Sequence, residues 1–508
     1  MPDNSANNKR IAKNSMLLYG RMVIVMAIGL YSSRIVLQSL GVEDYGIYNL
    51  VGGLVVFFAV INGAMLSSTQ RYINYGMGNT DKGGLPEIFN TARIIHALLA
   101  VIIVCAAESV GLWLLTHKLQ IPPDKAGAAM FVFQISIATV VIQVVTIPYN
   151  AVLVAHERMS VFAVISIIQA ALTLAAAFAL NLMDSHRLWL YAILMCIVQM
   201  VVALFYFFYC RSHFSETRIK TRLSKALFKE MSVFAGWCMV GCTAGILFTQ
   251  GLNILLGIFF LPYVNAARGI AVIIQNAISQ IFNNVQTAVV PQLLQSYARR
   301  DYTYFNSLVF KSSKYFSLLL LIVAIPFFIR APYIIQLWLG EEPEYTVIFT
   351  RILLGVALIE AISAPLMRAS EATGDIRKYH LVVGGILLTI VPIAYVVLKL
   401  GGQPQSVFYV YLVVSCVALA GRLIILKQKI NLPVGSYLVQ VLMRIGMVLA
   451  VAYPLCRIIS DYLSFNFLGL VIFCVITTAI IGFAIVVFGM TSNERSYLIA
   501  KLHSVFIK

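Results

Sequence analysis

Residues 45–70 of this chain form a run of 26 residues without a single charged side chain. The apolar core of a bilayer is about 30 Å thick, and a helix crosses it with roughly 20 residues. Comparable runs recur almost to the end of the 508-residue sequence. The pattern therefore predicts a chain that crosses a membrane many times.

The composition predicts a helical bundle rather than a series of soluble domains. Hydrophobic residues make up 60% of the chain and charged residues only 11%, whereas a soluble domain carries about 25% charged residues. Backbone in lipid must satisfy its own hydrogen bonds, which a helix does. The apolar runs do not alternate as the strands of a membrane barrel would. The predicted fold class is an all-α polytopic membrane protein.

We expect about 14 transmembrane helices. They are placed at 15–38, 45–69, 90–115, 127–153, 160–182, 188–210, 231–256, 262–290, 307–329, 347–367, 379–400, 406–426, 436–456 and 467–489. An even number places both termini on one side of the membrane. The loops of that side, with the termini, hold most of the 37 Lys and Arg residues but half of the 20 acids. Because excess Lys and Arg marks the cytoplasmic side, we predict that both termini are cytoplasmic.

This topology also explains the net charge of +17. The basic residues are scattered over many short loops, which disfavours a nucleic-acid partner. The most basic loop, 211–230, would attract anionic membrane lipids, although an orientation signal is the simpler explanation of its charge.

A faint internal repeat divides the chain into two lobes. Leu40-Gly41 and Leu256-Gly257 each precede a helix that is rich in Asn and Gln near its inner end. The predicted organisation is an N-terminal lobe at 1–210 with helices 1–6, a cytoplasmic loop at 211–230, and a C-terminal lobe at 231–428 with helices 7–12. Helices 13–14 and a cytoplasmic tail complete it at 429–508.

Polar side chains gather in a few of the predicted helices. In the eighth helix, Arg268, Gln275, Ser279 and Asn283 repeat at helical spacing along one face. Amides at membrane depth must face protein or water, so they indicate either interhelical hydrogen bonds or a hydrated cavity. A full-length stripe that includes an arginine favours the cavity. Arginine also suits phosphate through its paired N–H donors.

Other helices contribute further candidates for the lining of this cavity. They are Arg21, Arg34, Asn62, Arg71, Gln250 and Asn253. Arg21 and Arg71 can equally be boundary residues that reach the head groups. We interpret Arg93, Arg351 and Arg444 as such snorkelling residues.

Two acids fall in the middle of predicted helices, Glu108 in the third and Glu360 in the tenth. Such a carboxyl can bind a coupling proton or sodium ion, or it can be a hydrogen-bonded packing residue. The eight cysteines and seven histidines show no metal-ligand spacing, so we expect no metal and no other cofactor.

The segment from Arg34 to Leu50 resembles bacterial polysaccharide flippases of the O-antigen type. These belong to the multidrug/oligosaccharidyl-lipid/polysaccharide exporter superfamily. The resemblance rests on Leu40, Gly41, Tyr45, Gly46 and Tyr48, followed by Ser-Ser-Thr-Gln-Arg at 67–71. It implies two six-helix lobes around a central cavity in the bacterial inner membrane.

The resemblance implies translocation of an undecaprenyl-pyrophosphate-linked oligosaccharide to the periplasmic leaflet by alternating access. It implies no enzymatic activity, and it makes polymerase and chain-length components of the same pathway candidate partners. In related lipid II flippases, arginines of helices 1, 2 and 8 line the cavity, as Arg21, Arg34, Arg71 and Arg268 would here. A multidrug antiporter of the same fold is the alternative, and a glycan polymerase or ligase is a third class that the short loops disfavour.

Overall fold

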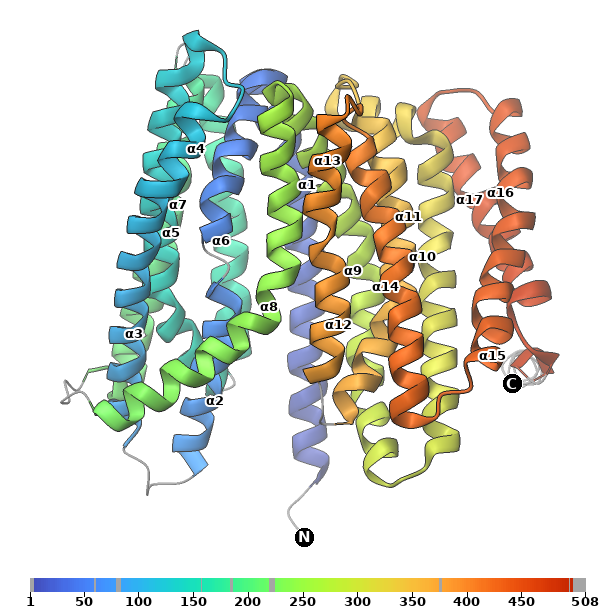
Figure 1. Ribbon diagram of the computed structural model, residues 1–508, viewed down its shortest axis with the longest axis horizontal. Helices are drawn as coiled ribbons and strands as arrows, with labels where there is room; N and C mark the ends of the chain where they lie inside the picture. Colours follow the sequence, from blue (N-terminus) through green and yellow to red (C-terminus); the bar gives the residue numbers. More distant parts are fainter. Residues whose placement is uncertain are drawn as a thin grey trace. The chain divides into compact units, whose positions relative to one another are not determined.

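The computed structural model describes residues 4–58, 61–78, 84–156, 158–182, 186–218, 224–373, 377–492 and 494–496. Every regular element in these ranges is a helix (Figure 1). Contacts divide the chain into two compact units, Met1–Ala266 and Ala267–Lys508, which we call unit 1 and unit 2. The predicted all-α membrane fold is confirmed. The predicted lobes, with their boundary at 211–230, remain a prediction.

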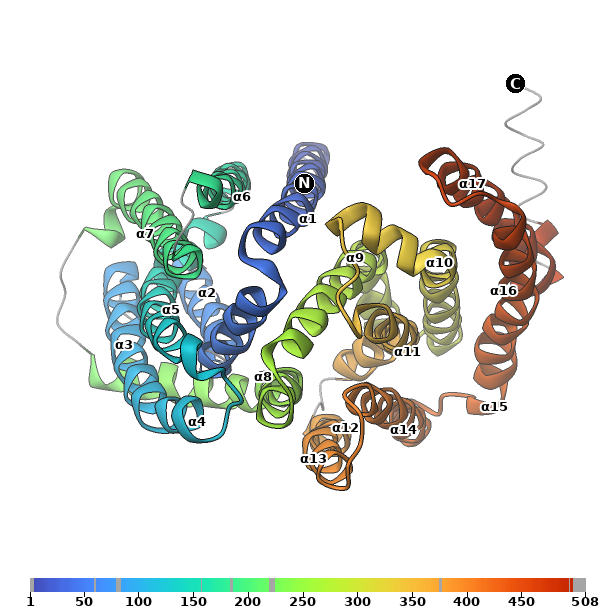
Figure 2. The same ribbon diagram turned by 90° about the horizontal axis from the view of Figure 1, so that it is seen from above.

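Unit 1 is a bundle in which α5 contacts α1, α2, α3, α6 and α7 (Figure 2). Its elements are α1 (Asn4–Phe58), α2 (Ile61–Gly78), α3 (Leu85–Ala106), η1 (Ala107–Gly111), α4 (Leu112–His117), η2 (Pro123–Lys125), α5 (Ala126–Ala155), α6 (Met159–Ala179), η3 (Leu180–Leu182), α7 (Arg187–His213), η4 (Ser215–Thr217), α8 (Lys225–Phe259) and the first residues of α9 (Pro262–Ala298). Helix α8 packs against α1, α2 and α3 in this unit.

Unit 2 contains the remainder of α9 and the helices that follow it. They are α10 (Tyr302–Leu339), α11 (Thr346–Ala372), α12 (Arg377–Leu388), α13 (Ile390–Lys399), α14 (Ser406–Ile430), α15 (Val434–Tyr437), η5 (Leu438–Met443), α16 (Arg444–Tyr462), α17 (Phe467–Ala484) and η6 (Ile485–Gly489). Helix α11 lies between α10 and α14, while α16 and α17 pack against α10.

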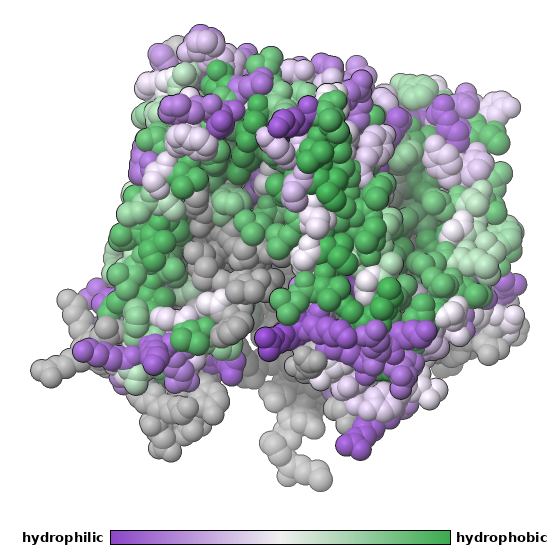
Figure 3. All heavy atoms as spheres, in the orientation of Figure 1, coloured by the Kyte–Doolittle hydropathy of each residue, from purple (hydrophilic) through white to green (hydrophobic). Residues whose placement is uncertain are grey.

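Each of the 14 predicted helices overlaps a helical segment of the structure. Within the described residues, 11 helical segments are long and apolar enough to cross a membrane. The three other predicted segments lie in the second half of α1, in α8 and in α9. On the visible face, apolar side chains cover the middle of the helices and hydrophilic ones gather toward their ends, as expected for membrane helices (Figure 3).

The first two predicted helices are joined through a sharp break inside α1. Gly41 has φ 77° and ψ 166°, a conformation that glycine adopts without the steric cost of a Cβ atom. The chain therefore turns at the end of the first span and continues directly into the second.

The second half of α1 lies very close to α8 and the first turn of α9. A Cβ atom on Gly46 would overlap the carbonyl oxygen of Pro262, and one on Gly53 would overlap the side-chain amide of Asn253. A Cβ on Gly257 would in turn strike Leu50. Small residues at such a contact let the backbones approach, which is a common way to pack helices in membranes.

The connection predicted between 330 and 346 is shorter than expected. Helix α10 is interrupted at Arg330, whose φ of −97° and ψ of 20° are not helical, and it then resumes and continues to Leu339, while α11 begins at Thr346. Arg330 lies at this break and is completely buried. Its side chain is held by hydrogen bonds to the end of α16, which lies 130 residues further along the chain.

Candidate functional site

Unit 2 contains a buried group of charged and aromatic side chains between α9, α11 and α14. Arg268 of α9 is 9% exposed and interacts electrostatically with Tyr411 of α14. The Tyr411 hydroxyl donates a hydrogen bond of 2.9 Å to Oε1 of Glu360 on α11. The predicted anion-binding arginine and the predicted coupling acid are thus connected through one tyrosine.

A second arginine extends this group toward α12. Arg422 of α14 donates through Nε to the Tyr379 hydroxyl at 3.0 Å and through a terminal nitrogen to the Ser363 hydroxyl at 3.1 Å. It also interacts electrostatically with Glu360. Sequence reasoning missed Arg422, because a charge one turn from the predicted end of a helix is typical of a membrane boundary. We call Arg268, Glu360, Tyr411 and Arg422 the unit 2 cluster.

The polar stripe of α9 divides between a buried and an exposed side. Gln275 and Ser279 are buried, and the Ser279 hydroxyl finds no hydrogen-bond partner within the described part of the chain. Asn276, Gln280 and Asn283 are exposed. Exposed amides on a membrane helix would be unsatisfied in lipid, so they favour contact with water.

In unit 1, Arg21 lies beside a polar pocket that sequence reasoning did not identify. Its guanidinium is 4.7 Å from the centre of the Phe162 ring, and it interacts electrostatically with Tyr206. Both aromatic residues line a pocket of about 310 Å³ between α5, α6 and α7. The other lining residues are Gln143, Thr146, Ile147, Asn150, Ser166, Gln169, Gln199 and Val202.

This unit 1 pocket is polar, and the described residues that line it carry no charge. Amide and hydroxyl groups of this kind donate and accept hydrogen bonds without attracting ions of one sign. The side-chain Oδ1 atom of Asn150 is buried with no hydrogen-bond partner in the described ranges. The pocket therefore suits a neutral group with several hydroxyls. Isolated amides in otherwise apolar helices, such as Gln143 and Gln199, are the signal that could have revealed it.

Asn253 of α8 lies at the contact between α1 and α9. Its amide donates to the Asn49 carbonyl oxygen at 3.1 Å, and it accepts from Asn265 through both its backbone and side-chain oxygens at 2.8 Å. It is 1% exposed. These contacts give Asn253 a role in helix packing. The neighbouring Gln250 is half-buried, with an Oε1 atom that has no partner among the described residues.

The remaining predicted basic residues of unit 1 differ in exposure. Arg34 is half-buried, whereas Arg71 is exposed and lies 4.3 Å from the centre of the Phe234 ring. The side chain of Asn62 lies outside the described residues.

The three arginines predicted to snorkel are half-buried and bonded to the protein. Arg93 donates to Asn90 at 2.9 Å, Arg351 donates to the Phe328 carbonyl oxygen at 3.1 Å, and Arg444 donates to the Met490 carbonyl oxygen.

Glu108 lies in η1, a turn of π-helix between α3 and α4, and accepts a hydrogen bond of 3.3 Å from Gln134. Turns of this type are frequent at functional sites. No group of three or more His, Cys, Asp or Glu side chains that could hold a metal occurs in the described ranges. Ion coupling by Glu108 or Glu360 remains a prediction.

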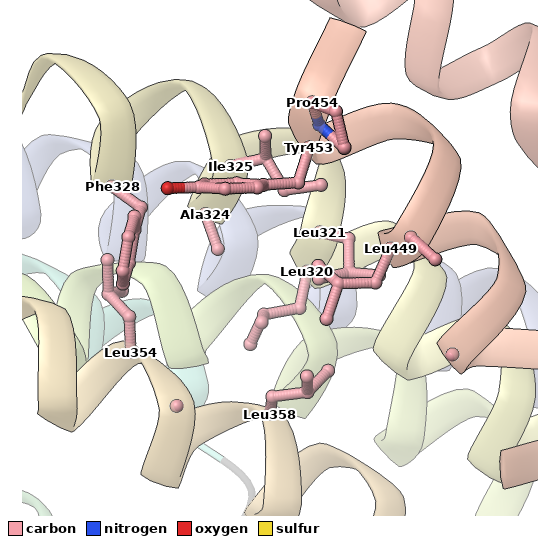
Figure 4. Close-up of a pocket in the computed structure, with 13 residues that line it drawn as sticks. Leu320, Leu321, Ala324, Ile325, Phe328, Leu354, Leu358, Leu449, Tyr453 and Pro454 are labelled. Atoms are coloured by element: carbon pink, nitrogen blue, oxygen red, sulfur yellow. The ribbon is translucent and has the colours of Figure 1, made fainter. Parts of the chain in front are cut away.

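An apolar pocket of about 460 Å³ lies between α10, α11 and α16 of unit 2 (Figure 4). Figure 4 shows Phe328, Leu354, Leu358 and Tyr453 around it, together with leucines of α10. Its lining suits hydrocarbon chains, whether they belong to a substrate or to the bilayer. It therefore does not distinguish a lipid-linked substrate from an ordinary lipid.

Several solved transporter structures have a fold similar to that of this chain. The lipid II flippase MurJ in an inward closed conformation is similar, with a TM-score of 0.72 and 12% identity over 92% of this chain and 98% of that chain. A multidrug resistance MATE family transporter in an inward-facing conformation has a TM-score of 0.65 and 15% identity over 82% and 98%. The MATE multidrug transporter DinF-BH has a TM-score of 0.58 and 14% identity over 84% and 96%.

No protein-family model matches the chain, and no curated protein matches it. At these identities the similar structures show the fold alone.

Proposed function

We propose that this chain is a flippase that moves an undecaprenyl-pyrophosphate-linked oligosaccharide from the cytoplasmic to the periplasmic leaflet of the bacterial inner membrane. The observation that carries the proposal is Arg268, a buried guanidinium on a helix whose neighbouring faces are rich in amides. A buried cation is retained where it has a partner or a function. Guanidinium binds phosphate oxygens in pairs, so a diphosphate is a fitting ligand.

The unit 2 cluster suggests how an empty site would be stabilised before substrate arrives. The Glu360 carboxyl interacts electrostatically with Arg422 and hydrogen-bonds Tyr411, the neighbour of Arg268, so its charge would offset part of the cationic charge of the cluster in a low-dielectric environment. A diphosphate would compete with Glu360 for this interaction. The exposed amides Asn276, Gln280 and Asn283 would then contact the hydrated head group as it passes.

The unit 1 pocket supports the oligosaccharide part of the proposal. It presents uncharged donors and acceptors beside Arg21, as sugar hydroxyls next to a phosphate would require. The flippase named MurJ shares the fold and is described as acting on lipid II, itself a lipid-linked substrate. The proposal requires a central cavity that opens alternately to the two sides, and it assigns the chain no enzymatic activity.

The test is Arg268→Ala in a strain that lacks the chromosomal gene. We expect surface glycan to fall by about tenfold or more, since a charge-assisted contact contributes about 1.5–3 kcal/mol. Lipid-linked oligosaccharide should accumulate on the inner leaflet while the protein level stays normal. Arg268→Lys should restore only part of the activity because it loses the paired donors.

Arg351→Ala is the matched control, because Arg351 is also an intramembrane arginine but donates its hydrogen bond to the backbone of Phe328 on the neighbouring helix. It should display normal glycan. Unchanged glycan display in Arg268→Ala would contradict the anion-site proposal.

A multidrug antiporter is the second candidate, and Glu360 is the observation that favours it. Exporters of organic cations need intramembrane acids, and Glu360 is a half-buried carboxyl in unit 2. The fold is also that of MATE multidrug transporters. Cells that express the chain would then resist organic cations, and Glu360→Gln would abolish that resistance without changing surface glycan.

A further inference from the structure

A polar pocket of about 370 Å³ lies at the end of unit 2 where the first turns of α10 meet η5 and the C-terminal segment that follows η6. It is separate from the unit 2 cluster. Its lining includes Lys311 and Lys314 of α10, Ser436 and Gln440 of the α15–η5 region, and Glu494 of the C-terminal segment. Because the apolar spans on either side end at Gly489 and begin at Val434, the pocket lies at a margin of the membrane region.

Lys314 is the buried cation of this pocket. Its side chain is 3% exposed, and its ammonium lies 2.6 Å from Oε2 of Glu494. Glu494 is in turn held by Thr491, whose backbone N–H donates to the same carboxylate oxygen at 2.8 Å. Burial alone would raise the pKa of Glu494, but the hydrogen bonds from Lys314 and from the Thr491 backbone outweigh it and lower the pKa. The carboxylate is therefore ionised at neutral pH and stays paired with Lys314.

One carboxylate does not balance the positive charge around the pocket. Lys311 is exposed on the adjacent turn of α10, and both Lys311 and Arg444 act electrostatically on Lys314. Ser436 and Gln440 add neutral donors on the opposite wall. Two lysines and several hydrogen-bond donors line a cavity of this size, and the charge of Arg444 acts on one of the lysines, so the cavity is an environment for a second anion.

We propose that this pocket binds the anionic phosphate group of a ligand, with Lys311 and Lys314 as its charged contacts and Glu494 as the fixed neighbour on Lys314. The chemistry that the pocket recognises is a phosphate with net negative charge. Such a group can come from the head group of an anionic phospholipid or from a soluble phosphate compound. The site is independent of the substrate of the transporter.

The test is the thermal unfolding of the purified full-length protein in a neutral detergent. The three probes are dihexanoyl phosphatidylglycerol, dihexanoyl phosphatidylcholine and inorganic phosphate. We expect the unfolding midpoint to rise with phosphatidylglycerol, because a ligand of the folded state stabilises it by mass action, and not with net-neutral phosphatidylcholine. A similar rise with inorganic phosphate would assign the site to soluble phosphates; a rise with phosphatidylglycerol alone would assign it to lipid.

Lys311→Ala should raise the concentration of phosphatidylglycerol that gives half of the maximal stabilisation by about tenfold or more, as expected for loss of a charge-assisted contact. This exposed variant is used instead of Lys314→Ala, which would leave Glu494 without its buried partner. Lys427→Ala is the matched control, since Lys427 is an exposed lysine in the last turn of α14 and does not line the pocket. Equal stabilisation by both lipids, no stabilisation at all, or an undiminished response in Lys311→Ala would overturn the proposal.

Discussion

At the scale of single residues, the glycines of the second half of α1 are distinguished by what surrounds them. Gly46 faces the Pro262 backbone, whereas a Cβ atom on Gly52 would meet nothing within 4 Å. Gly46→Ala should therefore destabilise the protein by about 1–3 kcal/mol, because the backbone that it meets cannot move aside as a flexible side chain could. Thermal unfolding in detergent measures this effect. Gly52→Ala is the control on the same helix, and an equal loss in both variants would show that helix flexibility, not packing, sets the requirement for glycine.

Asn253 and Arg268 show how far the candidate site could be predicted from single residues. Residue type alone predicts that polar side chains in apolar helices avoid lipid. What each contacts depends on other helices. Asn253 bonds to Asn49, 204 residues away, and Arg268 interacts with Tyr411. Spacing within one helix contains no information about such partners.

At the scale of elements, Arg330 attaches the α16–α17 pair to α10. Its guanidinium donates to the Ser460 hydroxyl at 3.0 Å and to the carbonyl oxygens of Ser460, Leu463 and Ser464 at 2.7–3.0 Å. These carbonyls belong to the end of α16, where a helix leaves acceptors without partners of its own. The rings of Phe465 and Phe473 lie 4.2 and 4.9 Å from the guanidinium.

Removal of this guanidinium should loosen the C-terminal helix pair. We expect Arg330→Ala to lower the stability by about 3 kcal/mol, since several buried acceptors lose a charged donor at once. In this variant, limited proteolysis at Arg457, which lies on α16, should become faster. The unfolding temperature should also fall. Arg457→Gln is the control for stability, because Arg457 forms an exposed pair with Asp461 at 3.6 Å, and such pairs contribute little. Equal unfolding temperatures for Arg330→Ala and the parent would refute this role.

The helices themselves could be predicted well, and their ends less well. Apolar runs of about 20 residues report the part of a helix in lipid, so all 14 predicted segments overlap helices. The ends lie further out, as in α8, which begins at Lys225, and α9, which continues to Ala298. The predicted helix end at 329 falls beside the break at Arg330, but α10 resumes after this break and continues to Leu339. The contacts that hold the Arg330 side chain come from α16 and cannot be read from the local sequence.

At the scale of the whole molecule, the fold does not decide between the two candidate functions, since it is shared with a lipid II flippase and with multidrug transporters. The charges inside the membrane region are more informative. Both Arg268 and Glu360 belong to one connected group, so substrate binding and ion binding would act on the same side chains. A transport cycle could then couple them by exchange of partners within the unit 2 cluster, without a signal that travels between distant sites.

This arrangement predicts that Glu360 sets the ion dependence of transport. Glu360→Gln preserves an oxygen that can accept the Tyr411 hydrogen bond but removes the carboxyl that would bind a proton or sodium ion. Flipping of a labelled lipid-linked oligosaccharide in proteoliposomes should therefore become independent of pH and sodium, while the parent protein responds to one of them. Glu108→Gln is the matched comparison, since Glu108 is also a mid-helix carboxyl with an amide partner, Gln134. If only Glu108→Gln made the flipping rate independent of pH and sodium, the coupling carboxyl would be Glu108 of unit 1. If the rate of both variants depended on pH or sodium as in the parent protein, neither carboxyl would be the coupling group.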